Sequence, residues 1–143
     1  MIYFDTSYLV RLYFQDAGWE AVRKLAGTDH LTCAAHGHAE MIAAFHRKLR
    51  EGVISPAHYA ALLGQLESDL SQGAITWLPI ATDTLNRAAH VYRSLPPSVF
   101  LRSADALHLA SAAQQGLGAV NSNDARLLAA APHFGLSGCN IIP

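Results

Sequence analysis

The sequence has 143 residues, the size of one ordinary domain with a core of its own. Half of the residues are hydrophobic (51%) and the formal net charge is −1, which disfavours a disordered chain and a protein that coats nucleic acid through excess positive charge. No apolar stretch approaches the roughly 20 residues that cross a bilayer, and no signal peptide with a basic start is visible, so we expect a soluble, cytoplasmic protein without a membrane partner.

The first seven residues predict a short buried strand that ends in a polar point. Four apolar residues, 1–4, favour an extended backbone, and Asp5 follows them directly, with hydroxyls at Thr6 and Ser7. On this stretch alone, capping of the next helix by Asp5 or Thr6 and a functional site are equally good explanations.

Helices and strands alternate along the rest of the chain. The predicted helices cover residues 8–14, 19–25, 37–50, 56–72, 82–94, 103–115 and 125–131, and the predicted strands cover residues 31–34, 74–80, 116–120 and 140–142. No linker, composition break or repeat interrupts the alternation. The pattern therefore predicts one α/β domain over residues 1–143, with a central, mainly parallel sheet flanked by helices.

Four acids fall at the same kind of place in this pattern. Asp5 follows a strand, Asp124 lies at a strand-to-helix turn, and Glu40 and Asp105 lie near the starts of helices. In an open parallel sheet the carboxyl ends of the strands and the amino ends of the following helices share one edge, where ligands usually bind. Each acid alone has a capping role as an explanation, but gathered carboxylates repel unless a proton or a cation neutralises them. Oxygen ligands without nearby cysteine favour Mg²⁺ or Mn²⁺ over zinc.

The chain resembles the PIN-domain ribonucleases and, more narrowly, the VapC-like toxins of type II toxin–antitoxin pairs. The matching stretches, in chain order, are IYFDTS at residues 2–7, AE at 39–40, LRSADALHLASA at 101–112 and SNDARL at 122–127. The resemblance covers nearly the whole chain and implies a PIN-like fold. It also implies a metal-dependent endoribonuclease, whose active site consists of Asp5, Glu40, Asp105 and Asp124.

The resemblance implies that these acids hold Mg²⁺ or Mn²⁺, and hydrolysis by a metal-bound water leads us to a hypothesis for the role of each. Asp5, Asp105 and Asp124 would hold Mg²⁺ or Mn²⁺, and Glu40 would hold a second ion or accept a proton. One departure concerns Glu40, which follows the residues His-Gly-His-Ala at 36–39 in place of the hydrophobic residue and Ser or Thr that the family favours.

Two serines match positions that support the acids. Ser7 and Ser122 would orient the first acid or a metal-bound water through a hydroxyl. Position 122 is more usually threonine in the family, and serine keeps the hydroxyl.

The remaining charges suggest how an anionic site could attract RNA. With four acids set aside, ten Lys and Arg face seven Asp and Glu, an excess of three positive charges. Candidates for phosphate contacts at the rim are Arg102, Arg126, Arg11 and Arg47, although structural ion pairing explains each of them as well. The resemblance further implies a small cognate antitoxin whose C-terminal segment covers the acids, and either a homodimer or a hetero-oligomer with that antitoxin.

Two other functions are compatible with the same residues. One is a metal-dependent hydrolase of DNA or another phosphoester. The other is a non-catalytic PIN-like protein-binding module, and the presence of all four acids counts against it.

The histidines near Glu40 suggest other contacts. His36, His38 and Glu40 alternate as zinc ligands do on a strand, but on the predicted helix the side chains of residues two apart point in directions that differ by about 200°. His108, three residues after Asp105, could donate a hydrogen bond to it, although a packed core histidine is the favoured interpretation.

Overall fold

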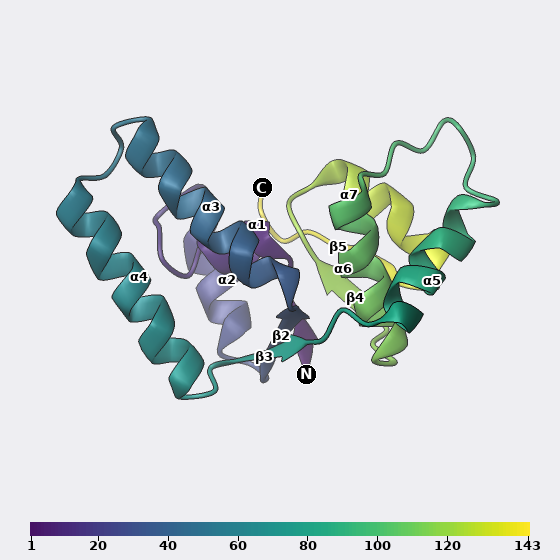
Figure 1. Ribbon diagram of the computed structural model, residues 1–143, viewed down its shortest axis with the longest axis horizontal. Helices are drawn as coiled ribbons and strands as arrows, with labels where there is room; N and C mark the ends of the chain where they lie inside the picture. Colours follow the sequence, from purple (N-terminus) through teal and green to yellow (C-terminus); the bar gives the residue numbers. More distant parts are fainter.

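Five short parallel strands form the centre of the computed structural model, which describes residues 1–143 (Figure 1). Three strands form one sheet in the order β1-β2-β3, and two form a second sheet, β4-β5. A parallel bridge between Phe4 and Asn121 joins them, so the order across the molecule is β3-β2-β1-β4-β5. The strands are β1 (Ile2–Tyr3), β2 (Leu31–Ala34), β3 (Ile75–Leu78), β4 (Ala119–Asn121) and β5 (Ser137–Cys139).

Helices cover both sides of these strands. In Figure 1, α1 to α4 lie on one side and α5 to α7 on the other. The helices are α1 (Thr6–Val10), α2 (Trp19–Ala26), α3 (His36–Arg50), α4 (Pro56–Ser71), α5 (Thr82–Tyr92), α6 (Ser103–Gln114) and α7 (Ala125–Ala130), followed by a 3₁₀ turn, η1 (Ala131–Phe134). None of them combines the length and the apolar character that a bilayer-spanning helix needs. The predicted α/β fold, a parallel sheet flanked by helices, is confirmed.

The strand alternation divides the buried side chains into two cores. Tyr3 packs with the residues under α5 to α7, such as Leu109 and Val120. Phe4, the next residue, packs with those under α1 to α4, such as Tyr8 and Phe45. Successive side chains of a strand point to opposite faces, so the first strand contributes to both cores and fixes the position of the residue that follows it, Asp5.

The predicted last strand is wrong in position. The sequence pattern favoured residues 140–142, but the strand that pairs with β4 is Ser137–Cys139. Asn140 ends it, because its side-chain oxygen accepts hydrogen bonds from Tyr8 Oη and from the Ile142 backbone N–H, both at 3.0 Å. Ile142 then packs beside Gly18, where a Cβ would lie 2.7 Å from its Cγ2. The two isoleucines therefore belong to a tail that closes the α1 side of the molecule.

Candidate active site

Asp5 lies at the carboxyl end of β1, between β2 and β4. It caps α1, since Oδ1 accepts a hydrogen bond from the Tyr8 backbone N–H at 3.2 Å. The same carboxylate accepts two hydroxyl hydrogen bonds, from Ser7 at 2.6 Å and from Ser122 at 2.5 Å, one on each oxygen. Burial raises the pKa of Asp5 against the opposing effects of His108 and of these hydrogen bonds. Asp5 is thus both a helix cap and a buried acid whose second oxygen is held by a distant part of the chain.

The turn after β4 brings Asp124 next to Asp5. Ser122 Oγ, which donates to Asp5, also accepts a hydrogen bond from the Asp124 backbone N–H at 2.8 Å. Asp124 caps α7 through Oδ1, which accepts from two backbone N–H groups of the first helical turn. Its other oxygen, Oδ2, accepts a hydrogen bond from the residue that directly precedes α6.

That residue is Arg102, which also contacts Asp105. Arg102 Nε donates to Asp105 Oδ2 and Arg102 Nη2 donates to Asp124 Oδ2, each at 2.8 Å. Asp105 is buried in the first turn of α6, whereas the Arg102 side chain is 55% exposed. One guanidinium therefore neutralises two acids that come from different helices.

Glu40 approaches the site from α3. Its Oε1 accepts a hydrogen bond from Thr6 Oγ1 at 2.9 Å and lies 2.5 Å from His108 Nε2 and 3.6 Å from His36 Nε2. Burial works to raise the pKa of Glu40, but the hydrogen bond and charge of His108 hold it below its ordinary value. Because Thr6 directly follows Asp5, one short segment holds an acid of β1 and an acid of α3 together.

His108 is a packed core histidine, as the sequence favours, since only 2% of it is exposed. The alternative, a donation to Asp105, is wrong: His108 Nε2 faces Glu40, and Nδ1 lies 2.7 Å from Tyr3 Oη. Burial disfavours its charged form, yet contacts with Cys33 and Glu40 raise the pKa of His108 to about 10.

The side chains of His36 and His38 point in different directions, as expected for two residues that are two positions apart on a helix. The helix starts at His36, so the ring of His38 points elsewhere and lies 5.7 Å from the ring of Trp77. A different trio does converge, because His36, Glu40 and His108 each place one ligand atom within 4.8 Å of the others. Both nitrogens carry a hydrogen, however, because His36 Nε2 donates to the Ala104 carbonyl oxygen at 2.9 Å and His108 Nε2 donates to Glu40.

Two side chains in contact with the site were missed from the sequence. The sequence pattern predicts only a capping role for Thr6, but its hydroxyl donates to Glu40. The pattern places Tyr3 in an apolar strand, but its hydroxyl contacts His108. The only available signal for Tyr3 was that a buried tyrosine needs a partner for its hydroxyl.

The predicted rim arginines lie on two sides of the acids. A hollow between α1 and α3 extends from Thr6 and Ser7 toward three cations, Arg11, Arg47 and Lys48. Each cation already has partners, which are backbone carbonyls for Arg11 and acids for Arg47 and Lys48. The lining of this hollow, which begins at Thr6 and Ser7 directly after Asp5, thus has three cations and the two acids Asp16 and Glu51, an excess of one positive charge.

On the α6 and α7 side, Arg126 and Arg102 both contact Asp124, Arg126 through its backbone N–H and Arg102 through its guanidinium. The Arg126 guanidinium is 4.3 Å from the centre of the Phe100 ring, and Phe100 is 57% exposed. An exposed aromatic ring and two arginines thus border the acids on that side.

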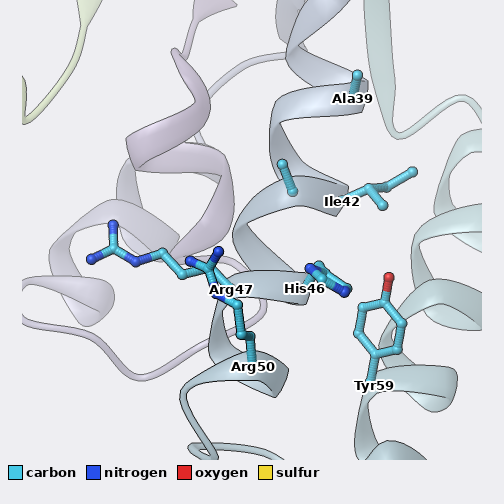
Figure 2. A pocket seen from close by; sticks show the side chains of 7 residues that line it. Ala39, Ile42, His46, Arg47, Arg50 and Tyr59 are labelled. Atoms are coloured by element: carbon cyan, nitrogen blue, oxygen red, sulfur yellow. The ribbon is translucent and has the colours of Figure 1, made fainter.

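A larger groove lies between α3 and α4, away from the acids. Figure 2 shows His46 and Tyr59 facing each other across it, with 6.0 Å between their ring centroids. Its lining consists of Ala39, Ile42, Ala43, His46, Arg47, Arg50 and Tyr59. None of the four acids lines it, so the largest hollow of the molecule is not the acidic site.

The carboxylates of the acidic site have the chemistry of ligands for a hard divalent cation, but not the spacing. Only His36, Glu40 and His108 bring three ligand atoms within 4.8 Å of one another, and Asp5, Asp105 and Asp124 do not. Asp5, Asp105 and Asp124 present carboxylate oxygens, and no cysteine lies among them. Asp5 is buried with hydroxyl and amide donors only, and Arg102 supplies the one positive charge between the other two. Oxygen ligands of this kind suit Mg²⁺ or Mn²⁺.

Comparison with known proteins agrees with this architecture. The family model of the PIN domain matches residues 2–132. Three solved structures are similar. FitAcB from Neisseria gonorrhoeae has 18% identity and a TM-score of 0.73, covering 98% of this chain and 97% of that one. A toxin–antitoxin complex from Klebsiella pneumoniae has 14% identity and a TM-score of 0.64, covering 93% and 94%. VapBC2 from Rickettsia felis, bound to a DNA fragment from its promoter, has 12% identity and a TM-score of 0.62, covering 98% of each chain. At these identities the likeness establishes the fold. No protein with a curated description matches the chain.

Proposed function

The chain belongs to the PIN-domain family, whose members are generally nucleases, and from that membership we propose that it is a metal-dependent endoribonuclease, the toxin of a toxin–antitoxin pair in the cytoplasm. The observation that carries the proposal is that four acids, from the α1 cap, α3, α6 and the α7 cap, lie at one edge of the parallel sheet, linked through Thr6, Arg102 and Ser122. Such an edge is where open α/β sheets bind ligands.

The reaction would be an in-line attack of water on a backbone phosphorus, leaving a 5′-phosphate and a 3′-hydroxyl. Asp5, Asp105 and Asp124 would hold Mg²⁺ or Mn²⁺. When bound, the ion supplies a water of lowered pKa and neutralises charge that develops on the phosphoryl and leaving oxygens. Ser7 and Ser122 keep both oxygens of Asp5 in a fixed orientation.

Glu40 would hold a second ion or accept a proton. Its pKa is held below the ordinary value, so it remains a carboxylate at neutral pH, the form that accepts a proton or holds a second cation. The two hydrogen-bond donors at Oε1, Thr6 and His108, fix its position.

RNA would reach the acids across the two cationic surfaces. The hollow with Arg11, Arg47 and Lys48 is one, and the rim with Arg102 and Arg126 is the other. Phosphate contacts of this kind carry most of the affinity for nucleic acid and compensate for the repulsion by the acids.

A small antitoxin would be the partner that keeps this nuclease inactive. The similar structures include a toxin–antitoxin complex and VapBC2, which supports the proposal of such a partner for this chain. Its C-terminal segment would cover the acids. A homodimer, or a hetero-oligomer with the antitoxin, would be the assembly.

Replacing Asp5 with Asn tests the nuclease function. The purified protein is incubated with Mg²⁺ or Mn²⁺ and single-stranded RNA, structured RNA or DNA, and the chemistry of the new ends is determined. We expect RNA cleavage that EDTA abolishes and that Asp5→Asn reduces by about 100-fold or more, without loss of the fold in circular dichroism.

Asp83→Asn is the matched control, because Asp83 is an exposed acid in the first turn of α5. It should leave cleavage unchanged. Cleavage of DNA with RNA spared would favour the alternative phosphoester hydrolase. Cleavage that survives both EDTA and Asp5→Asn would refute the assignment of the site.

A further inference from the structure

A buried chain of polar contacts leads from the sheet to Glu40. The Ala34 backbone N–H donates to Tyr3 Oη at 3.0 Å, Tyr3 Oη lies 2.7 Å from His108 Nδ1, and His108 Nε2 lies 2.5 Å from Glu40 Oε1. Tyr3 is 1% exposed. The chain joins residues of β1, β2, α6 and α3 that lie far apart in the sequence.

The chemistry of the two side chains determines which of them donates the hydrogen bond between His108 and Glu40. A carboxylate accepts hydrogen bonds only, so the hydrogen between His108 and Glu40 belongs to Nε2. This holds for the imidazolium and also for the neutral ring, in which Tyr3 O–H donates to Nδ1 and leaves the hydrogen on Nε2. In either form Tyr3 fixes the rotation of the ring that donates to Glu40.

All these contacts reach a single oxygen of Glu40. Thr6 and His108 both donate to Oε1, and His36 Nε2 also lies nearest to Oε1. Oε2 has no protein partner, and the side chain is one-third exposed. One oxygen is therefore anchored in the protein while the other remains free for the reaction.

We propose that His108, held by Tyr3, is a positioning residue that anchors Glu40 through Oε1 and keeps Oε2 available to the reacting water. The role rests on the proposed nuclease function, because it assigns His108 to the reaction through Glu40. His108 itself touches neither the RNA nor the reacting atoms.

Two substitutions of His108 separate this role from simple packing. The glutamine of His108→Gln can bring its amide N–H close to the place of Nε2 and still donate to Glu40. The asparagine of His108→Asn reaches only the place of Nδ1, so it keeps Tyr3 and loses Glu40. Both substitutions remove the imidazole ring from the core, and urea unfolding measures the loss of stability that they have in common.

We expect His108→Asn to lower kcat for RNA cleavage by about 10- to 100-fold with a KM change of less than about threefold, and His108→Gln to recover most of kcat. Tyr3→Phe, which removes only the hydroxyl, should lower kcat less than His108→Asn does. Ser111→Ala is the control on the same helix, because the Ser111 hydroxyl is buried without a partner and has no link to Glu40; its kcat should equal that of the wild type.

Equal kcat losses in His108→Asn and His108→Gln, in an active and folded protein, would overturn the positioning role. That outcome would also be expected if His108 were a ligand of a cation shared with His36, since an amide does not replace an imidazole ligand. A folded wild type that cleaves no RNA would instead refute the proposed function, and the positioning role with it.

Discussion

Arg102 occupies the space between Asp105 and Asp124, with each contact at 2.8 Å. A divalent cation held by the same carboxylates has to compete with this guanidinium. We therefore expect Arg102→Gln to tighten Mn²⁺ binding by roughly three- to tenfold, since exposed ion pairs contribute up to about 1 kcal/mol each. Calorimetric titration of the protein with Mn²⁺ measures this without any RNA.

Arg126→Gln is the control for this prediction. It removes the same charge a short distance away, but the Arg126 guanidinium contacts Phe100, and only the Arg126 backbone N–H, which the substitution keeps, donates to Asp124 Oδ1. It should change Mn²⁺ affinity by less than about twofold. Equal tightening of Mn²⁺ binding in both variants would mean that only the overall electrostatic field of the protein matters. Weaker Mn²⁺ binding in Arg102→Gln would contradict a competition between Arg102 and the ion for the carboxylates.

At the scale of single residues, the sequence predicts where the acids lie better than it predicts which side chains contact them. The positions of Asp5, Asp105 and Asp124 follow from the ends of strands and the starts of helices, which local patterns predict. The contact of Tyr3 with His108 joins residues 105 apart, and no local periodicity encodes it. Which oxygen of Glu40 is anchored depends on rotamers, which only the packed structure determines.

At the scale of elements, the close packing of α3 on β2 depends on Gly37. A Cβ at this residue would lie 2.5 Å from Cys33 Sγ, 3.3 Å from Trp77 Cζ3 and 3.5 Å from His108 Cε1. Gly37→Ala should lower the free energy of unfolding by about 1–3 kcal/mol, because overpacking outweighs the gain of about 1 kcal/mol in helix propensity. Urea unfolding measures the change.

Gly64→Ala is the matched control in the exposed interior of α4. No atom lies within 4 Å of its added Cβ, so only helix propensity changes, and the protein should gain about 0.5–1 kcal/mol. A gain of stability in Gly37→Ala as well would show that α3 can move away from β2 without cost, contrary to the packing described.

The wrong strand at residues 140–142 has a physical reason at the same scale. Two neighbouring isoleucines favour a strand locally, but Ser137–Cys139 pairs with β4 instead. Gly138 permits this, since a Cβ there would lie 3.0 Å from the Leu128 side chain and from its carbonyl oxygen. Close approach between a strand and a helix cannot be seen in the hydrophobic pattern, whereas the alternation that predicted the α/β class can.

At the scale of the whole molecule, the acids come from both groups of helices, which lie on the two sides of the strands in Figure 1. Glu40 comes from the α1 to α4 side, Asp105 and Asp124 come from the α6 and α7 side, and Asp5 comes from the strand between them. The arginines are divided in the same way, and Arg11 and Arg47 lie on the α1 to α4 side of the acids. An RNA strand that crosses the acids would therefore contact both groups of helices.

This arrangement predicts which arginines affect RNA binding. In EDTA, where no cleavage occurs, the affinity for single-stranded RNA should fall steeply with added salt. Arg47→Ala should lower the slope of log K against log salt by about 0.7, the share of one phosphate contact on a single strand. Arg11 donates to the carbonyl oxygens of Ser7 and Ala17, so Arg11→Ala should lower stability in urea as well as the slope.

Arg87→Ala supplies the comparison, because Arg87 lies on α5 beside His133 and away from the hollow between α1 and α3. The two variants lose the same charge, so a slope that changes only in Arg47→Ala locates the phosphate contact in that hollow. An equal change in both variants would mean that RNA responds to the net charge of the protein alone. A slope unaffected by Arg47→Ala and lowered by Arg126→Ala would restrict the RNA to the α6 and α7 side, where the exposed ring of Phe100 adjoins the acids.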